Sequence, residues 1–462
     1  EGPAAETQSV AASNIQWVDV APEAGLDFQY FNTTTKTYGP DHIMTAPGGG
    51  VGVIDYDCDG WPDLYFPQAG PWDQRGDQNP YVDRLFRNLG DGRFVDVTEQ
   101  AGLKDGEFSG GVAIGDYNND GYPDIYVVNI GENRLFQNMG DGTFRNVTAA
   151  AGCGGGPDIW STSGAMVDLN GDGCSEIYSV NYVLLHEALA RGCGQKGQAM
   201  GCAPTLFHFE QDRLFHNLGD GRFRDVTDEA GILTPDGKGL SVLAGDFTGT
   251  GRLDLFVAND TTPNLYFANQ VSQPGQPLQF VESGVEVGVA MNANGQSQAS
   301  MGLTVGDANG DQLADFYVGT FYHDSNTLFV QSSANTFADE SRMAGLRDPT
   351  FKMLTFGTQF VDADLDGALD IFQANGHVDR SYDPSVPDLM PPQFLWNRGD
   401  GYFKEVTADS LGSYFQQECL GRGVAVIDFD RDGRPDLVVS HLDVPAALLA
   451  NRTPDAGHHL KL

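Results

Sequence analysis

Hydrophobic and polar positions alternate along this chain in a unit that returns seven times. Each copy has a run of small and apolar residues, a short acidic turn, and a second apolar run rich in β-branched and aromatic residues. The acidic turns begin at Asp55, Asp116, Asp168, Asp246, Asp307, Asp362 and Asp428. Short apolar runs bounded by Gly and Asp are typical of strands joined by tight turns, so each unit predicts strand, acidic turn, strand.

A second turn signal follows six of the seven acidic turns. Clear copies of a strand, Gly-Asp-Gly turn and strand phrase lie at 84–98, 134–148, 213–227 and 394–407, and weaker copies at 265–283 and 328–341. Each unit therefore predicts four short strands. Four-stranded units repeated at this period indicate an all-β, seven-bladed β-propeller.

The two ends of the chain predict how the ring closes. Residues 15–26 repeat the fourth-strand phrase found at 94–103, although no first three strands precede them, and the seventh unit lacks a clear fourth strand. We therefore expect residues 15–20 to complete the last blade, which leaves no unpaired edge strand. An open array of modules or two separate sheets is the alternative.

The predicted organisation is an N-terminal extension (1–14), a single propeller (15–457) and a short tail (458–462). The predicted blades lie near 48–98, 111–148, 162–227, 240–283, 300–341, 355–407, and 422–450 together with 15–20.

The acidic turns follow the pattern D-x-[DN]-x-[DN]-G-x-x-[DE], which predicts metal sites. Side chains at positions 1, 3, 5 and 9 and the carbonyl at position 7 can converge on one cation, and charged oxygen ligands favour calcium. We expect about six or seven Ca²⁺ ions per chain. An EF-hand would need Glu at position 12, which in these loops is Phe, Val, Ser or Gln. Solvated turns without metal are the other interpretation, and seven copies in register argue against it.

The predicted ligands are taken loop by loop. They are Asp55, Asp57, Asp59, Trp61 and Asp63; Asp116, Asn118, Asp120, Tyr122 and Asp124; Asp168, Asn170, Asp172, Cys174 and Glu176; Asp246, Thr248, Thr250, Arg252 and Asp254; Asp307, Asn309, Asp311, Leu313 and Asp315; Asp362, Asp364, Asp366, Ala368 and Asp370; and Asp428, Asp430, Asp432, Arg434 and Asp436. Loops one, six and seven have four carboxylates each, and loops two, three and five have three. Loop four has two, so we predict that it is the weakest site or is empty.

Charge and cysteine content narrow the class of protein. The 64 acidic and 26 basic residues give a net charge of −38, which excludes nucleic acid as a partner. No apolar run approaches the ~18 residues of a membrane span. Among six cysteines, Cys193 and Cys202 are predicted to form a disulfide, and the sequence does not pair the others. The chain begins at Glu1 as a processed form would, so we expect a removed signal peptide and a secreted, periplasmic or cell-surface protein.

These phrases resemble the FG-GAP/VCBS repeat, the propeller of integrin alpha-subunit heads, where similar hairpins bind calcium. Their order is closest to the ASPIC/UnbV (cartilage acidic protein) family. The shared phrases lie at 50–65, 193–204, 299–307, 373–378 and 458–462. The resemblance implies an extracellular binding or scaffolding role, with a protein or a surface glycan as partner.

The face opposite the acidic turns is expected to carry the longest connections, where recognition usually occurs. The candidate contacts are Trp72, Tyr81, Trp160, Tyr322, His323, His377, Tyr382 and His441. Loop aromatics packed on the rim are the alternative. A transition-metal site is a further hypothesis for this face, formed by His42, His323, His377 and His441 with Asp324, Asp379 and Asp443; independent surface histidines are the other interpretation.

Catalytic motifs give little support for an enzyme. The sequence has no HExxH, no nucleophile elbow and no P-loop. The leading hypothesis is therefore a non-catalytic recognition or scaffolding module. The alternative is a polysaccharide lyase or hydrolase working at the loop-rich face, against which the few, dispersed basic residues argue.

Overall fold

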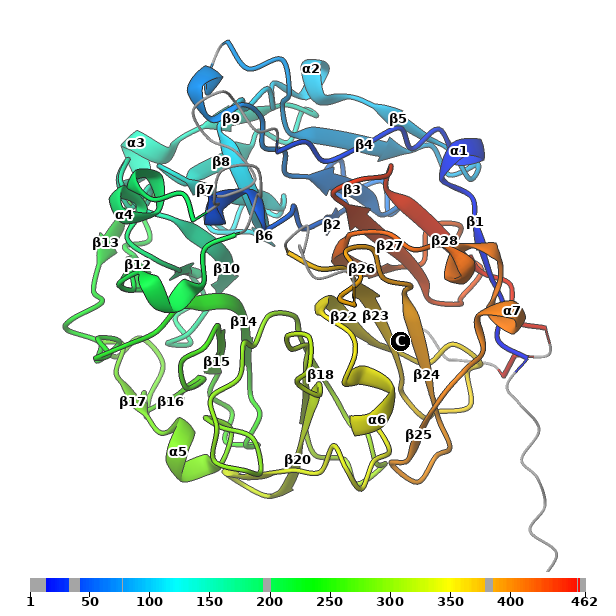
Figure 1. The fold of residues 1–462 in the computed structure, drawn as a ribbon. Coiled ribbons are helices and arrows are strands. Elements are labelled where there is room, and N and C mark those ends of the chain that lie inside the picture. Colours follow the sequence, from blue (N-terminus) through cyan, green and yellow to red (C-terminus); the bar gives the residue numbers. More distant parts are fainter. Residues whose placement is uncertain are drawn as a thin grey trace, which may run out of the picture.

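Seven antiparallel four-stranded sheets are arranged radially around one axis in the computed structural model of this chain (Figure 1). The structure describes residues 14–32, 42–76, 78–193, 201–378, 385–454 and 456–457. In six of the sheets four consecutive strands follow one another from the axis to the rim, and in the seventh the rim strand comes from the N-terminal segment. The predicted all-β, seven-bladed propeller is confirmed.

Each blade is built from strands of three to eight residues. Blades one to three contain β2 (Gly52–Ile54), β3 (Asp63–Phe66), β4 (Arg84–Asn88) and β5 (Phe94–Asp96); β6 (Phe108–Gly115), β7 (Asp124–Ile130), β8 (Arg134–Asn138) and β9 (Phe144–Asn146); and β10 (Ser161–Val167), β11 (Glu176–Asn181), β12 (Arg213–Asn217) and β13 (Phe223–Asp225). Blades four to six contain β14 (Gly239–Gly245), β15 (Asp254–Asn259), β16 (Leu265–Asn269) and β17 (Phe280–Glu282); β18 (Leu303–Gly306), β19 (Asp315–Val318), β20 (Thr327–Ser333) and β21 (Thr336–Asp339); and β22 (Thr355–Val361), β23 (Asp370–Asn375), β24 (Gln393–Asn397) and β25 (Phe403–Glu405).

Blade seven closes the ring with strands from both ends of the chain. Its first three strands are β26 (Gly421–Ile427), β27 (Asp436–His441) and β28 (Ala447–Asn451). The rim strand is β1 (Trp17–Asp19), which lies beside β28 (Figure 1). The two strands pair antiparallel, with Trp17 opposite Asn451. The predicted closure by the N-terminal strand is confirmed.

Single-turn helices follow the rim strands, and other short helices lie in the connections. They are α1 (Ala21–Ala24), α2 (Thr98–Ala101), α3 (Thr148–Ala151), α4 (Leu185–Ala190), α5 (Gly284–Val287), α6 (Arg347–Thr350) and α7 (Ala408–Leu411), with 3₁₀ turns η1 (Ile43–Thr45), η2 (Trp72–Gln74), η3 (Pro204–Leu206) and η4 (Ser413–Gln416). Gly25 and Gly102 end α1 and α2 with φ of +72° each, a conformation that glycine adopts without steric cost. Within the described residues, no helix has the length and apolar character needed to cross a bilayer.

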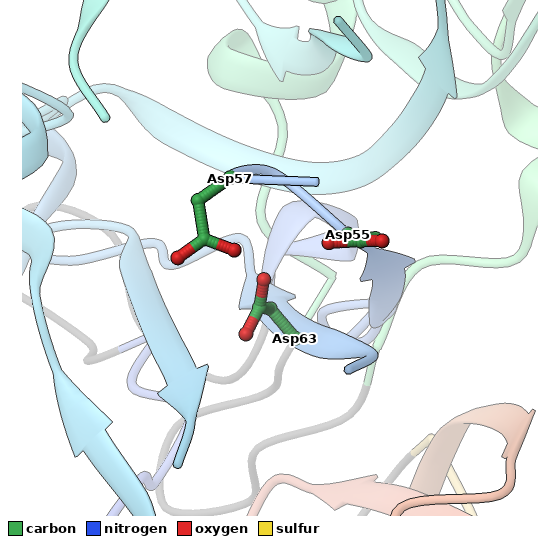
Figure 2. Close-up of side chains that lie close together, drawn as sticks. All are labelled: Asp55, Asp57 and Asp63. Atoms are coloured by element: carbon green, nitrogen blue, oxygen red, sulfur yellow. The ribbon is translucent and has the colours of Figure 1, made fainter. Parts of the chain in front are cut away.

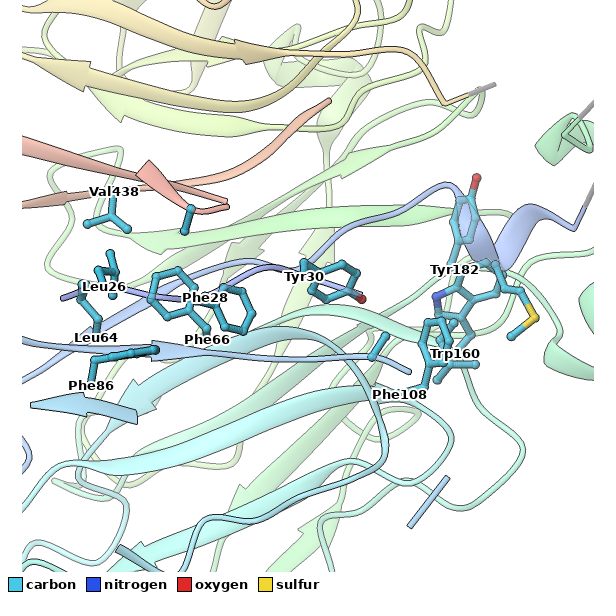
Figure 3. Packing of buried hydrophobic residues seen from close by; sticks show 14 of the residues in the cluster. Leu26, Phe28, Tyr30, Leu64, Phe66, Phe86, Phe108, Trp160, Tyr182 and Val438 are labelled. Atoms are coloured by element: carbon cyan, nitrogen blue, oxygen red, sulfur yellow. The ribbon is translucent and has the colours of Figure 1, made fainter. Parts of the chain in front are cut away.

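Apolar side chains fill the spaces between neighbouring blades. Between blades seven and one, the segment after α1 inserts Leu26 and Phe28 against Leu64, Phe66 and Val438 (Figure 3). The Phe28 and Phe66 rings stack with centroids 4.4 Å apart. The N-terminal segment therefore contributes both the closing strand and part of the core at the closure.

Inner strands of adjacent blades approach closely around the axis. A Cβ at Gly357 would lie 2.2 Å from the carbonyl oxygen of Arg422 in the next blade, and one at Gly302 would lie 2.1 Å from the carbonyl oxygen of Phe356. Only glycine fits such contacts. Because the antiparallel strands follow the same order in every blade, the first-to-second-strand turns lie on one face of the disc and the longer connections lie on the other.

Candidate metal centre

The seven acidic loops join the innermost strand of each blade to its second strand. The position-9 carboxylate is the first residue of that second strand in every blade: Asp63, Asp124, Glu176, Asp254, Asp315, Asp370 and Asp436. All seven are at most 3% exposed. The position-9 group is therefore a buried acid at the base of an exposed loop.

The loop backbone is shaped by two left-handed residues. Position 6 has positive φ, as in Gly60 (+84°) and Gly433 (+86°), and so does position 4, as in Cys58 (+55°) and Arg431 (+54°). The amide of position 6 donates to the position-1 carboxylate, with Gly60 N 3.0 Å from Asp55 Oδ2. The sequence predicted the glycine turn at position 6. It also carries a signal for position 4, which is glycine in loops three, four and five and Asn119 in loop two, although the ligand pattern leaves this position open.

Carboxylates converge in loops one, six and seven. In each of these loops, three carboxylate oxygens lie within 4.8 Å of one another: Asp55, Asp57 and Asp63; Asp362, Asp364 and Asp366; and Asp428, Asp430 and Asp436. Figure 2 shows the Asp57 and Asp63 carboxylates facing one another, with Asp55 beside them. Asp55 Oδ1 and Asp364 Oδ1 are buried without a hydrogen-bond partner. A buried, unpaired carboxylate oxygen beside other carboxylates is a fitting ligand for a hard cation.

Burial raises the pKa of the position-9 carboxyls in these loops. The pKa of Asp63 rises to about 7 and that of Asp436 to about 8, and the pKa of Asp370 is raised well above its ordinary value. Desolvation is the first cause in each case, and neighbouring loop carboxylates add to it. A divalent ion would offset this cost by neutralising the cluster.

Loops two, three and five differ because Asn occupies position 3. Its amide donates to the position-5 carboxylate: Asn118 to Asp120 at 2.9 Å, Asn170 to Asp172 at 3.1 Å, and Asn309 to Asp311 at 3.1 Å. Within the described residues, these loops do not bring three carboxylate oxygens within 4.8 Å. Their oxygens are thus partly satisfied inside the loop.

In loop four, the position-9 carboxylate is hydrogen-bonded to a tyrosine hydroxyl. Asp254 Oδ2 accepts the Tyr266 hydroxyl at 2.7 Å, and Thr248 Oγ1 lies 3.4 Å from the same oxygen. The corresponding oxygen in the other loops accepts the amide of position 2, as Asp63 does from Tyr56. The signal in the sequence is Tyr266 itself, because the other blades have Leu or Phe at that place in the third strand.

Arginines form ion pairs with the acids of loops one and seven. Arg87 Nε lies 2.7 Å from Asp57 and its Nη2 3.0 Å from Asp59. Arg452 Nη2 lies 3.0 Å from Asp430, and its Nη1 lies 3.4 Å from Asp432. Counting acids along the sequence missed these partners, because both arginines come from the third-strand side of the blade.

Comparison with known proteins places these loops in a family. A model of the FG-GAP-like repeat matches residues 69–127, 116–179, 206–257 and 362–439, which together make up more than half of the chain. The chain belongs to the FG-GAP-like repeat family.

Curated relatives of this FG-GAP chain include cartilage acidic protein 1 from Mus musculus and from Homo sapiens. Each is 27% identical over 280 residues, or 60% of this chain, and the aligned part is 38% of the mouse protein and 37% of the human one. The chain thus spans about two fifths of the length of these relatives.

Two solved structures are among those similar to this FG-GAP chain. An Agrocybe aegerita lectin that recognises non-reducing terminal N-acetylglucosamine matches with 16% identity, 86% coverage of both chains and a TM-score of 0.41. BBS1N in complex with ARL6DN matches with 8% identity, coverage of 97% of this chain and 99% of that one, and a TM-score of 0.48.

The loop-rich face of the FG-GAP disc has a cavity of about 770 Å³. It lies between blades three and six, and its lining includes Tyr182, Asp260, Met301, Phe321, Tyr322 and Asp324. The disulfide Cys193–Cys202 borders it, with Cα atoms 5.1 Å apart, and confirms the predicted pairing. Among the described residues, Cys58, Cys153, Cys174 and Cys419 form no disulfide.

Among the described residues, Tyr322 and His323 are the predicted contact residues that line this cavity. Tyr81 is partly exposed and stacks on Phe31, with centroids 3.8 Å apart. Tyr382 lies outside the described residues, as does Asp379.

The other predicted contact residues are buried. Trp72, Trp160, His377 and His441 are at most 8% exposed. His441 accepts the Tyr414 hydroxyl and lies 2.9 Å from the Pro445 carbonyl. In the structure these four side chains are covered by neighbouring residues, and their contact with a partner stays a prediction. The described histidines and acids of this face do not form a metal-ligand cluster.

Proposed function

We propose that this chain is a calcium-stabilised propeller that serves as an extracellular recognition or scaffolding module for a protein or glycan partner. The observation that carries the proposal is the convergence of three carboxylates in each of loops one, six and seven. The ligands would be the aspartates at positions 1, 3, 5 and 9, together with the position-7 carbonyls of Trp61, Ala368 and Arg434.

Calcium suits these loops better than other ions. The donors are all oxygen, several are charged, and the loops lie at the surface, where six to eight ligands including water are accessible. Magnesium requires a stricter octahedral arrangement, and soft metals prefer sulfur or imidazole. Bound calcium would hold each hairpin by replacing the repulsion between its acids with attraction to one cation.

The loops are expected to bind unequally. Loops one, six and seven form the stronger group, loops two, three and five form a weaker one, and loop four is last because Tyr266 and Thr248 already occupy Asp254. This order refines the expectation of about six or seven ions per chain.

The partner is proposed to bind on the loop-rich face at the 770 Å³ cavity. Apolar and aromatic walls with a few polar groups are typical of binding sites. A disulfide beside the cavity supports an oxidising location outside the cytoplasm. Among the residues that the structure describes, the lining of the cavity contains no lysine or arginine, which disfavours the alternative of an enzyme acting on an acidic polysaccharide.

Thermal unfolding with calcium, with excess chelator and with calcium restored tests the metal part of this proposal, with elemental analysis of the purified protein. We expect a large, reversible fall in melting temperature on chelation and several calcium ions per chain. An unchanged melting temperature together with no bound calcium would contradict the proposed calcium sites. A screen of glycans and extracellular proteins then tests recognition: binding lost on substitution of Tyr322 supports it, whereas turnover of a polysaccharide would favour the enzyme.

A further inference from the structure

Seven buried side-chain amides link each blade to the acidic loop of its neighbour. Each lies at or near the end of the third strand and donates a hydrogen bond of 2.7–2.9 Å to the carbonyl oxygen of position 2 in the preceding loop. We call them the bridging amides; they are Asn88, Asn138, Asn217, Asn269, Gln331, Asn397 and Asn451. All are at most 3% exposed, so water does not compete for these bonds.

Each bridging amide is also tied to the loop of its own blade. In blade two, the backbone N–H of Asn138 donates to Asp124 Oδ1 at 2.7 Å, while its side chain donates to the Tyr56 carbonyl of loop one at 2.8 Å. The same pair of bonds occurs in the six blades whose position-9 residue is Asp. One residue therefore joins the position-9 carboxylate of one loop to the backbone of the next loop.

The peptide that receives this bond is itself a support of the neighbouring site. The backbone N–H of Tyr56 donates to Asp63 Oδ2 at 3.2 Å. Asp63 Oδ1 accepts the backbone N–H of Asn88, whose side chain is the next bridging amide. Asn88 reaches the Phe429 carbonyl in loop seven. Carboxylate, amide and peptide thus alternate from loop two to loop one to loop seven.

Direct contacts between loops follow the same path. The Arg431 guanidinium of loop seven lies 4.4 Å from the ring centroid of Trp61 in loop one. Cys58 Sγ of loop one lies 3.8 Å from the Gly121 carbonyl of loop two. Asn119 of loop two donates to the Gly173 carbonyl of loop three. These contacts bring position 4 of one loop against position 6 or 7 of the next.

We propose that the bridging amides are positioning residues that couple calcium binding between neighbouring loops, so that an ion in loop two raises the affinity of loop one. The inference rests on the proposed calcium function. An ion in loop two holds the Asp124 carboxylate, which accepts the backbone N–H of Asn138. The side chain of Asn138 in turn holds the Tyr56 peptide, whose N–H donates to Asp63. The backbone of loop one then loses less conformational entropy when its own ion binds, so its calcium affinity is higher. By linkage, an ion in loop one raises the affinity of loop two by the same factor.

Trp61 makes loop one observable. Terbium occupies calcium sites and is sensitised by a nearby tryptophan, so terbium luminescence excited through Trp61 reports loop-one affinity. The Trp61→Phe variant supplies the background from the other tryptophans. The test compares wild type, a loop-two variant (Asp116→Asn with Asp120→Asn), Asn138→Ala, and the combination of all three substitutions.

We expect the loop-two variant to weaken loop one about fivefold, near the low end of usual coupling, and Asn138→Ala to weaken it similarly. In the double-mutant cycle the combination should be no worse than Asn138→Ala alone. Asn138→Gln, which keeps the amide that blade five uses in Gln331, should restore part of the affinity. Gln137→Ala, the adjacent residue outside the relay, is the matched control.

Independent loops would overturn the inference: loop-one affinity would stay within about twofold of wild type in the loop-two variant, against usual couplings of about fivefold or more. Retention of the loop-two effect in Asn138→Ala would overturn it as well. If circular dichroism shows that Asn138→Ala does not fold, the loop-two variant, which leaves the relay intact, decides. Loop one binding neither terbium nor calcium would overturn the proposed function together with this inference, whereas independent binding overturns this inference alone.

Discussion

The Tyr266 hydroxyl donates to Asp254 Oδ2 at 2.7 Å. This hydrogen bond distinguishes loop four from the other acidic loops. It takes the carboxylate oxygen that in the other loops faces the position-2 amide, and Thr248 approaches the same oxygen. Two hydroxyl groups at this one oxygen leave it less available to a cation than the oxygen that faces a single backbone amide in the other loops.

Loop four is therefore expected to contribute no calcium to the stoichiometry. Asp246→Asn should leave the number of bound ions unchanged, whereas Asp428→Asn in loop seven should lower it by about one, because it removes a charged ligand from a converged site. Elemental analysis after dialysis against buffered calcium measures both. Loss of an ion from Asp246→Asn would show that loop four binds metal despite Tyr266.

Arg87 is expected to compete with calcium in loop one. Its guanidinium pairs with Asp57 and Asp59, so Arg87→Gln frees two ligands and should raise loop-one affinity by up to about fivefold, or about 1 kcal/mol for a partly exposed pair. Terbium titration read through Trp61 measures the change.

Arg93→Gln is the matched control for that prediction. Arg93 pairs with Asp91 in the Gly-Asp-Gly turn of the same blade, outside the acidic loop. Arg93→Gln should therefore leave the metal affinity of loop one unchanged. Equal affinities in wild type and Arg87→Gln would mean that the arginine moves aside at no cost.

Asp212 is expected to make stability depend on pH. It is buried, accepts Tyr178 OH and Asn181 N at 2.7 Å each, and burial raises its pKa from 3.8 to about 7. The folded protein therefore keeps this proton at pH values where the unfolded chain has lost it. Its stabilising effect is fully present below about pH 4 and is lost as pH rises through 7, by on the order of 4 kcal/mol at most.

Asp212→Asn should flatten that dependence. The substitution fits because Asn133 holds the same place in blade two, where it accepts Asn129 N at 2.9 Å and donates to Tyr126 OH at 3.0 Å. Denaturant unfolding between pH 4 and 8 at constant saturating calcium checks it, with the exposed Asp228→Asn as control. An unchanged pH profile would show that another group controls this range.

Trp17 is expected to hold the ring closed. It is 2% exposed on β1 and lies against Phe394 of blade six, with ring centroids 6.0 Å apart. Trp17→Ala should lower the free energy of unfolding by about 3–5 kcal/mol through the cavity it leaves. Val18→Ala, on the outward side of the same strand and 48% exposed, should change it by less than about 0.5 kcal/mol. Similar losses in both variants would mean that pairing of β1, rather than the Trp17 side chain, stabilises the closure.

The repeat itself made much of this fold predictable. Strand-turn-strand units in register determine blade number, and the stray fourth-strand phrase at 15–26 determined where β1 pairs. The Cys193–Cys202 bridge was also predictable, since the two residues are nine positions apart in one connection. Burial of residues on the loop-rich face was not predictable from the sequence. Trp160 and His441 lie in segments that resemble exposed loops, and they are buried because neighbouring blades pack against them.

The sequence by itself determined the propeller, its closure and the positions of seven acidic hairpins, because these depend on residues close together within one repeat. Only the tertiary structure decided which hairpins gather their acids and which groups compete for them. Tyr266, Arg87 and Arg452 act on the loops from third strands or the segment after them. The bridging amides act from the next blade, across about 80 to 340 residues of chain. Such contacts depend on how the strands and blades lie in space, and periodicity along the chain carries no record of them.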